Sequence, residues 1–134
     1  MTYWKVKSYE NIECAEMMII KNKHSSSIHC SYYSNIQLML HVISINLNKQ
    51  EKDIENEARK GRIGFHIWLK NTIIRELGFR NFMIVRDFNN FLGKLKKLRI
   101  EADYKNILIS EKKARDGLNT SKIVSEILSE NFKI

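Results

Sequence analysis

Proline is absent from the 134 residues of this chain, and glycine occurs only five times. Because these two residues most often end helices and form tight turns, their scarcity leaves long helices uninterrupted and argues against an all-β fold. The sequence also lacks an apolar run of membrane-spanning length, and its first residues do not form a signal peptide. We therefore expect a helical protein of the cytoplasm that has no membrane partner.

Cysteine and metal-ligand patterns are equally sparse. The two cysteines, Cys14 and Cys30, lie within apolar helical patterns, which favours buried free thiols in a reducing compartment over a disulfide. The four histidines show no spacing typical of metal ligands, and no glycine-rich phosphate loop is present. The sequence therefore predicts neither a metal nor a cofactor.

The overall composition is that of a soluble globular protein. Hydrophobic residues make up 43% and charged residues 28% of the chain, and a chain of this length typically forms one domain, here residues 1–134. The formal net charge is +8. Such an excess is typical of proteins that bind polyanions, but it also occurs where lysine is abundant for other reasons. Charge alone leaves both interpretations open.

Apolar residues recur at helical spacing in five segments, which predicts an all-α fold, an antiparallel bundle of about five helices. The serines at 25–27 are N-cap candidates for the second helix, Gly78 is expected to end the third, and Ser110 is expected to cap the fifth. The charged stretch 49–61 is expected to be a loop, with at most a short helical turn at 54–59. The predicted helices are residues 2–21, 26–48, 64–77, 81–106 and a last one that follows Ser110.

The long fourth segment contains the most informative residue. Its apolar stripe is interrupted at one inward position, which holds Arg99. An arginine is costly to bury unless it is paired or lines a wet groove, and Asp103 lies one turn further on as a partner. The pair is either a structural contact that anchors this helix to the second through Tyr32 or Tyr33, or a phosphate-binding arginine oriented by an acid. The stripe itself consists of Val85, Phe88, Leu92, Leu95 and Ala102.

Basic residues around Arg99 form a second candidate binding surface. If they follow an RNA backbone, binding must weaken steeply with salt, and otherwise they are a solvated helix face. The group comprises Lys94, Lys96, Lys97 and Arg99, with Arg75, Arg80 and Arg86 nearby.

Three motifs follow one another along the chain: S-S-S-I-H-C-S-Y-Y-S-N-I-Q at 25–37, His66 at the start of the third helix, and L-R-I-E-A-D-Y at 98–104. Together they resemble the HEPN superfamily of small prokaryotic helical proteins, in its branch with an R-x-x-A-D-Y-type ending, and the resemblance spans residues 9–128. It implies an antiparallel helical bundle that forms a homodimer with a cleft at the dimer interface. Many relatives are metal-independent endoribonucleases of toxin–antitoxin or other defence systems, often paired with a nucleotidyltransferase antitoxin.

The sequence departs from the ribonuclease branch of that superfamily at the catalytic position. The motif of that branch, R-x4-6-H, requires a histidine where this chain has Tyr104, and the polar residue that often follows the arginine is Ile100 here. A phenol, with a reference pKa of about 10, is a poor general base at neutral pH. His66 is a second source of a titrating group, and Arg59 and Arg62 precede it at similar spacing, although on a loop and at a helix start.

We therefore expect a catalytically degenerate member of this group that binds RNA or a nucleotide at the dimer cleft, within a toxin–antitoxin or defence system. Two alternatives stay open. One is an active metal-independent endoribonuclease toxin that uses Arg99 with Tyr104 or His66, and the other is a protein-interaction module that pairs with a nucleotidyltransferase antitoxin. The expected ligand-binding residues are Arg99, Asp103, Tyr104, Tyr32, Tyr33 and Lys96.

Overall fold

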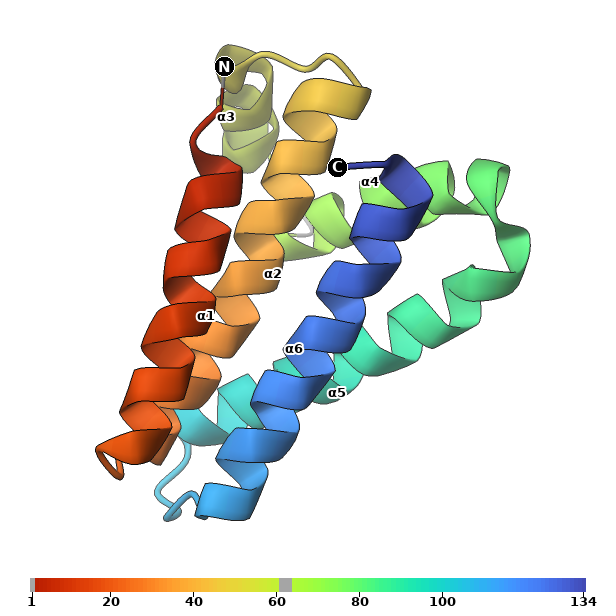
Figure 1. Ribbon diagram of the computed structural model, residues 1–134. Helices are drawn as coiled ribbons and strands as arrows, with labels where there is room; N and C mark the ends of the chain where they lie inside the picture. The colour runs from red at the N-terminus through yellow and green to blue at the C-terminus, as the bar shows by residue number, and fades with distance from the viewer. Residues whose placement is uncertain (1, 61–63) are drawn as a thin grey trace.

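The computed structural model describes residues 2–60 and 64–134, and within these ranges the chain forms six α-helices and no strand (Figure 1). The all-helical fold predicted from the sequence is confirmed, with one helix more than expected. None of these helices combines the length and the apolarity that a membrane span requires. The elements are α1 (Trp4–Ile20), α2 (His24–Asn46), α3 (Glu51–Lys60), α4 (Phe65–Arg80), the 3-10 turn η1 (Phe82–Ile84), α5 (Val85–Tyr104) and α6 (Glu111–Phe132).

Three long helices, α1, α2 and α6, stand side by side with α2 in the middle, and α5 crosses them obliquely (Figure 1). The pairs α1–α2 and α5–α6 form antiparallel hairpins. Helices α2 and α6 instead run in the same direction. This is shown by their hydrogen-bonded pairs, in which the difference in residue number stays constant along the two helices. The Asn35 side-chain amide donates to the Ser121 carbonyl and the Asn46 side-chain amide to the Phe132 carbonyl, and both pairs are 86 residues apart. The bundle is therefore antiparallel within its hairpins and parallel where the two hairpins meet.

The main apolar core lies between α2, α4, α5 and α6. Phe88 on the inner face of α5 is fully buried there, together with Met39 of α2 and Leu128 of α6. A smaller cluster joins α1 to the first turns of α2 and the start of α6, and it includes Ile19 and Ile28. The larger core holds α5 against α2, the two helices that carry most of the predicted site residues.

Residues 51–60, which were predicted to lie in a charged loop with at most a short helical turn at 54–59, instead form α3 over their whole length. Acidic side chains lie in the first turn of this helix and Arg59 and Lys60 in its last turn, an arrangement that complements the helix dipole. Ile54 buries its side chain in the main core. The loop prediction was wrong because it relied on apolar periodicity, whereas charge placement and one buried residue stabilise this helix. Gly61, at the end of the same stretch, lies outside the described residues.

The junction between α4 and α5 also differs from the prediction. Gly78 does not end α4, because the helix continues to Arg80 and the N–H of Asn81 donates to the Leu77 carbonyl at 2.8 Å. A Cβ on Gly78 would lie 3.9 Å from a methyl group of Val85. The glycine therefore lies at the contact between α4 and the start of α5 rather than at a helix end, and η1 precedes α5.

Serine side chains have two different roles at the helix starts. Ser110 caps α6 as predicted, because its Oγ accepts a hydrogen bond from the Lys113 N–H at 3.2 Å. The predicted capping role of serines 25–27 is wrong, since these residues lie inside α2. Ser27 is buried and its Oγ donates to the Ala15 carbonyl of α1 at 2.8 Å. This serine joins two helices instead of ending one.

The two cysteines are free thiols, as expected, although they are half-buried rather than buried. Cys14 of α1 and Cys30 of α2 face each other with their Sγ atoms 3.4 Å apart. Burial and the neighbouring Cys14 raise the pKa of Cys30 to about 12. The Cys30 thiol therefore stays protonated at neutral pH.

Candidate functional site

Arg99 projects from the C-terminal part of α5 into a cage of tyrosine rings. Its guanidinium carbon lies 5.2, 5.5 and 5.3 Å from the ring centres of Tyr32, Tyr33 and Tyr104. The side chain is 13% exposed. A guanidinium above aromatic faces is attracted to their electron density, and the attraction grows as water is excluded. Arg99 therefore points inward, as predicted, and its surroundings there are aromatic side chains.

Hydrogen bonds hold the Arg99 side chain in this cage. Its Nε donates to Oδ2 of Asp103 at 3.1 Å, which confirms the predicted ion pair. Its Nη2 donates to the Tyr33 hydroxyl at 3.0 Å and more weakly to the Tyr104 hydroxyl at 3.4 Å. Within residues 2–60 and 64–134 the Nη1 group donates to no protein atom, so two of the five guanidinium N–H groups are uncommitted.

His29 of α2 binds the same carboxylate oxygen as Arg99. Its Nδ1 lies 2.9 Å from Oδ2 of Asp103, and its ring centre lies 4.6 Å from that of Tyr33. The side chain is half exposed. His29 was not among the site residues predicted from the sequence, although it precedes Tyr32 and Tyr33 by three and four residues and so shares a helix face with them.

His66 at the start of α4 completes the far side of the cage. Its Nδ1 is hydrogen-bonded to the Tyr32 hydroxyl at 3.0 Å, and its ring centre lies 5.7 Å from that of Tyr33. Burial, and then the charges of Arg99 and Lys96, lower the pKa of His66. Burial raises the pKa of Tyr32 to about 12, despite the opposing charge of Arg99. A neutral imidazole therefore faces a protonated phenol at neutral pH.

These side chains form one group that we call the Arg99 cluster. The fold brings together residues from α2, α4 and α5 that are far apart in the sequence. All three predicted catalytic residues belong to this group: Arg99 and Tyr104 contact each other, and His66 is connected to Arg99 through Tyr32 and Tyr33. Lys96, which was predicted to bind the ligand, borders it and lines a small cavity of about 30 Å³ beside Tyr32 and His66. The Arg99 cluster consists of His29, Tyr32, Tyr33, His66, Arg99, Asp103 and Tyr104.

The charge balance of the Arg99 cluster favours anions. Burial by itself lowers the pKa of Arg99, but Tyr33, Tyr104, Tyr32 and Asp103 outweigh it, so the pKa stays above its ordinary value. The guanidinium is therefore permanently charged. Only one carboxylate lies in the cluster, and both His29 and Arg99 already bind it. A bound anion meets a positive centre with free donors.

The other basic residues singled out in the sequence lie outside the Arg99 cluster. Lys94 and Lys97 are exposed on the outer face of α5. Arg59 is exposed in the last turn of α3 and has no hydrogen bond to His66 within the described part of the chain, and Arg62 lies outside that part. The alternative arginine–histidine pair built on residue 59 is therefore not supported.

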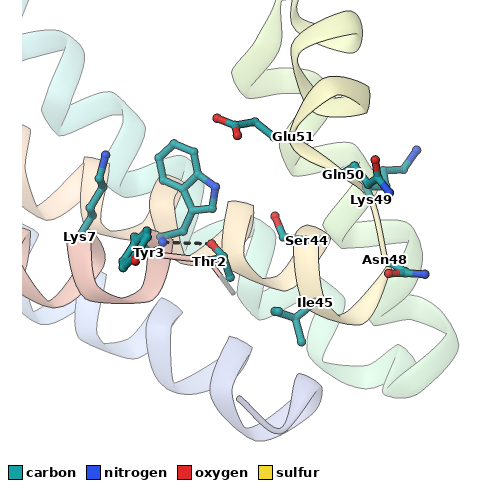
Figure 2. Close-up of a pocket in the computed structure, with 10 residues that line it drawn as sticks. Thr2, Tyr3, Lys7, Ser44, Ile45, Asn48, Lys49, Gln50 and Glu51 are labelled. Carbon is teal, nitrogen blue, oxygen red and sulfur yellow. Dashed lines mark hydrogen bonds between the residues drawn. The ribbon is translucent and has the colours of Figure 1, made fainter.

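A larger cavity of about 520 Å³ lies elsewhere, between the start of α1 and the junction of α2 with α3 (Figure 2). Figure 2 shows Lys7 of α1 and Glu51 of α3 among the residues that line it, and its dashed line is the hydrogen bond from the Trp4 N–H to the Thr2 hydroxyl, 3.1 Å long. No residue of the Arg99 cluster lines this cavity, and the described residues that line it include neither a histidine nor an arginine. We place the candidate site at the Arg99 cluster because a fixed cation and titrating groups converge there. The cavity is lined by Thr2, Tyr3, Trp4, Lys7, Ser44, Ile45, Asn48, Lys49, Gln50 and Glu51.

Comparison of the chain with protein-family models, with curated proteins and with solved structures finds no match. The resemblance to the HEPN superfamily therefore stays a prediction, and function has to be argued from the Arg99 cluster itself. Across the described ranges, no three histidine, cysteine or acidic side chains are grouped as they are in a metal site.

The lowered pKa of His66 predicts a dependence of stability on pH. The folded protein keeps this imidazole neutral, whereas the unfolded chain protonates it below its ordinary pKa of 6.5. Protons then bind preferentially to the unfolded chain, so the free energy of unfolding falls as the pH drops below that value, by at most about 1.4 kcal/mol per pH unit from this one group. Urea unfolding at several pH values will show a smaller fall in His66→Gln than in the wild type. Equal falls in the two proteins would contradict the assignment, since His41, the other histidine whose pKa is lowered, acts alike in both.

Proposed function

We propose that this chain is a HEPN-like protein that binds RNA or a nucleotide through a phosphate group at the Arg99 cluster. The observation that carries the proposal is a nearly buried arginine that is held by Asp103 and Tyr33 yet keeps its Nη1 group free. Guanidinium groups bind phosphate oxygens through paired N–H donors, and fixing the side chain in advance removes part of the entropic cost of binding.

The aromatic side chains of the Arg99 cluster support RNA or a nucleotide as the ligand rather than a simple anion. Tyr104 is 71% exposed beside the guanidinium, so one face of its ring is open to a base. Stacking of bases on aromatic rings tolerates any sequence, because every base has a flat face. Lys94 and Lys97 extend the positive surface along α5. A phosphate at Arg99 with its base on Tyr104 satisfies both features.

Exposed apolar side chains next to the Arg99 cluster support a homodimer. Leu108 is 98% exposed, and Ile107 and Ile100 are also exposed near Tyr104 at the end of α5. Apolar groups gathered on a surface mark a site of contact with another molecule. We propose that a second copy covers this end of α5, so that two Arg99 clusters face one cleft.

The second candidate function is metal-independent cleavage of RNA, and the position of His66 favours it. A neutral imidazole is a competent general base at neutral pH, and His66 lies in the same cluster as the arginine. We prefer binding without cleavage because His66 reaches the guanidinium only through the rings of Tyr32 and Tyr33. A phosphate held by Arg99 is then separated from the His66 imidazole, the group that would have to act as the general base.

Incubation of the protein with a mixture of tRNA and mRNA in EDTA tests both functions at once. We expect the RNA to be retarded in a native gel and to stay intact, and we expect Arg99→Ala to abolish the retardation. Cleavage that persists in EDTA and disappears in both Arg99→Ala and His66→Gln would establish the ribonuclease instead. RNA that is neither bound nor cut would refute the proposal.

A further inference from the structure

The outer face of α1 carries an exposed stripe with the spacing of a coiled-coil seam. Its residues follow one another at alternating steps of three and four, the pattern that brings one face of a helix against a partner helix. Both ends of the stripe are apolar and open to solvent, with Tyr3 68% and Ile20 78% exposed and Val6 and Met17 each 50% exposed. We call this stripe the α1 seam, and it consists of Tyr3, which directly precedes the helix, and of Val6, Glu10, Glu13, Met17 and Ile20.

The position of α1 in the bundle leaves the α1 seam uncovered. The helix forms the outer edge of the molecule and packs on α2, with lesser contact to α6 (Figure 1). Its buried residues Ala15 and Ile19 lie on the opposite face and meet the smaller core cluster. Exposed apolar side chains that gather on one helix face, here Tyr3, Val6, Met17 and Ile20, are typical of a surface that contacts another molecule.

The centre of the α1 seam is acidic in a protein of net charge +8. Glu10 and Glu13 are exposed, and neither forms an ion pair with any residue that the structure describes. The neighbouring Glu16 is already bound to Lys122 at 3.0 Å. A helix that carries basic side chains in the middle of its own apolar stripe complements this surface in both polarity and charge. We propose that the α1 seam docks an amphipathic, centrally basic helix of a partner protein.

A second copy of this chain fits the α1 seam less well. An antiparallel pairing of two seams matches the apolar ends but places Glu10 opposite Glu13 of the other copy, so that four carboxylates meet at the centre. A parallel pairing places each carboxylate opposite its own counterpart. Both arrangements bring like charges together and remove them from water, which opposes association at neutral pH. A partner helix with lysines opposite Glu10 and Glu13 has no such repulsion. None of the residues in the α1 seam belongs to the Arg99 cluster, so this proposal is independent of the proposed function.

The test measures binding of a synthetic helical peptide to the full chain at neutral pH by fluorescence anisotropy. The probe has leucines at the outer seam positions and lysines at the two central ones, and the matched control peptide has glutamates there instead. We expect the lysine peptide to bind at least about tenfold more tightly. We also expect Ile20→Asp to weaken its binding, Phe79→Asp on α4 to leave it unchanged, and Glu10→Lys with Glu13→Lys to reverse the preference.

Three results would overturn the proposal. They are equal affinities for the two peptides, no binding of either peptide, or a dimer at neutral pH in analytical ultracentrifugation that Ile20→Asp dissociates. The last result would assign the α1 seam to a second copy of the chain. Because the substituted side chains are exposed, an unchanged thermal midpoint confirms that each variant is folded.

Discussion

Replacing Arg99 with alanine is expected to weaken the binding of single-stranded RNA by about 100-fold, or about 2.7 kcal/mol. The guanidinium supplies the charge-assisted donors for the phosphate, and Asp103 and Tyr33 hold it in place before the ligand arrives. The change also lowers the free energy of unfolding, but only by about 1 kcal/mol, because its hydrogen-bond partners are near the surface and regain water. Fluorescence anisotropy with a labelled RNA measures the first effect and urea unfolding the second.

The control for this prediction is Arg86→Ala, which removes the same charge from the same helix. Arg86 is exposed near the start of α5 and takes no part in the Arg99 cluster. Its loss is expected to weaken RNA binding by no more than about threefold, through the general electrostatic attraction alone. Equal effects of the two substitutions would show that binding follows net charge and not the cluster. Unchanged RNA binding in Arg99→Ala, with a large loss of stability, would make the arginine a structural anchor.

Replacing Phe88 with alanine is expected to lower the free energy of unfolding by about 3–5 kcal/mol. The Phe88 ring is fully buried in the main core, where the packing around it cannot close the space that the ring leaves. Urea or thermal unfolding measures the change directly.

The matched control is Phe82→Ala in η1, three residues before α5 begins. This ring is 78% exposed, so its removal is expected to change the free energy of unfolding by less than about 0.5 kcal/mol. A small effect at Phe88, or similar effects at both positions, would contradict the packing of α5 described above.

The spacing of apolar residues was sufficient to place Arg99 on the inner face of a long helix. The four-residue spacing also predicted the pair of Arg99 with Asp103. Tyr32 or Tyr33 was expected to be the contact on the second helix, and the hydrogen bond is to Tyr33. The helix at 51–60 was not predicted because it is stabilised by the placement of its charged residues, which an analysis of apolar spacing does not detect. His29 was missed because it was judged only as a metal ligand, although its spacing from Tyr33 places the two on one face of α2.

The parallel direction of α2 and α6 could not be predicted from apolar periodicity, for a different reason. Two amphipathic helices show which faces are buried but not the direction in which the helices meet. In this structure, buried polar contacts join the two helices in the parallel direction. The Asn35 amide donates to the Ser121 carbonyl, and the Ser121 hydroxyl donates to the Ser31 carbonyl. Such contacts depend on an offset of 86 and 90 residues that no local pattern contains.

The most direct test of the central claim uses the four histidines as reporters of where the ligand binds. His29 and His66 lie in the Arg99 cluster, whereas the His24 ring is hydrogen-bonded to the Ile109 carbonyl and His41 is remote from the site on α2. Titration with a nucleoside monophosphate, followed by NMR of the imidazole ring protons, is expected to shift the signals of His29 and His66 saturably and to leave the other two in place. Signals of His29 and His66 that do not move, or shifts of equal size at all four histidines, would contradict phosphate binding at the Arg99 cluster.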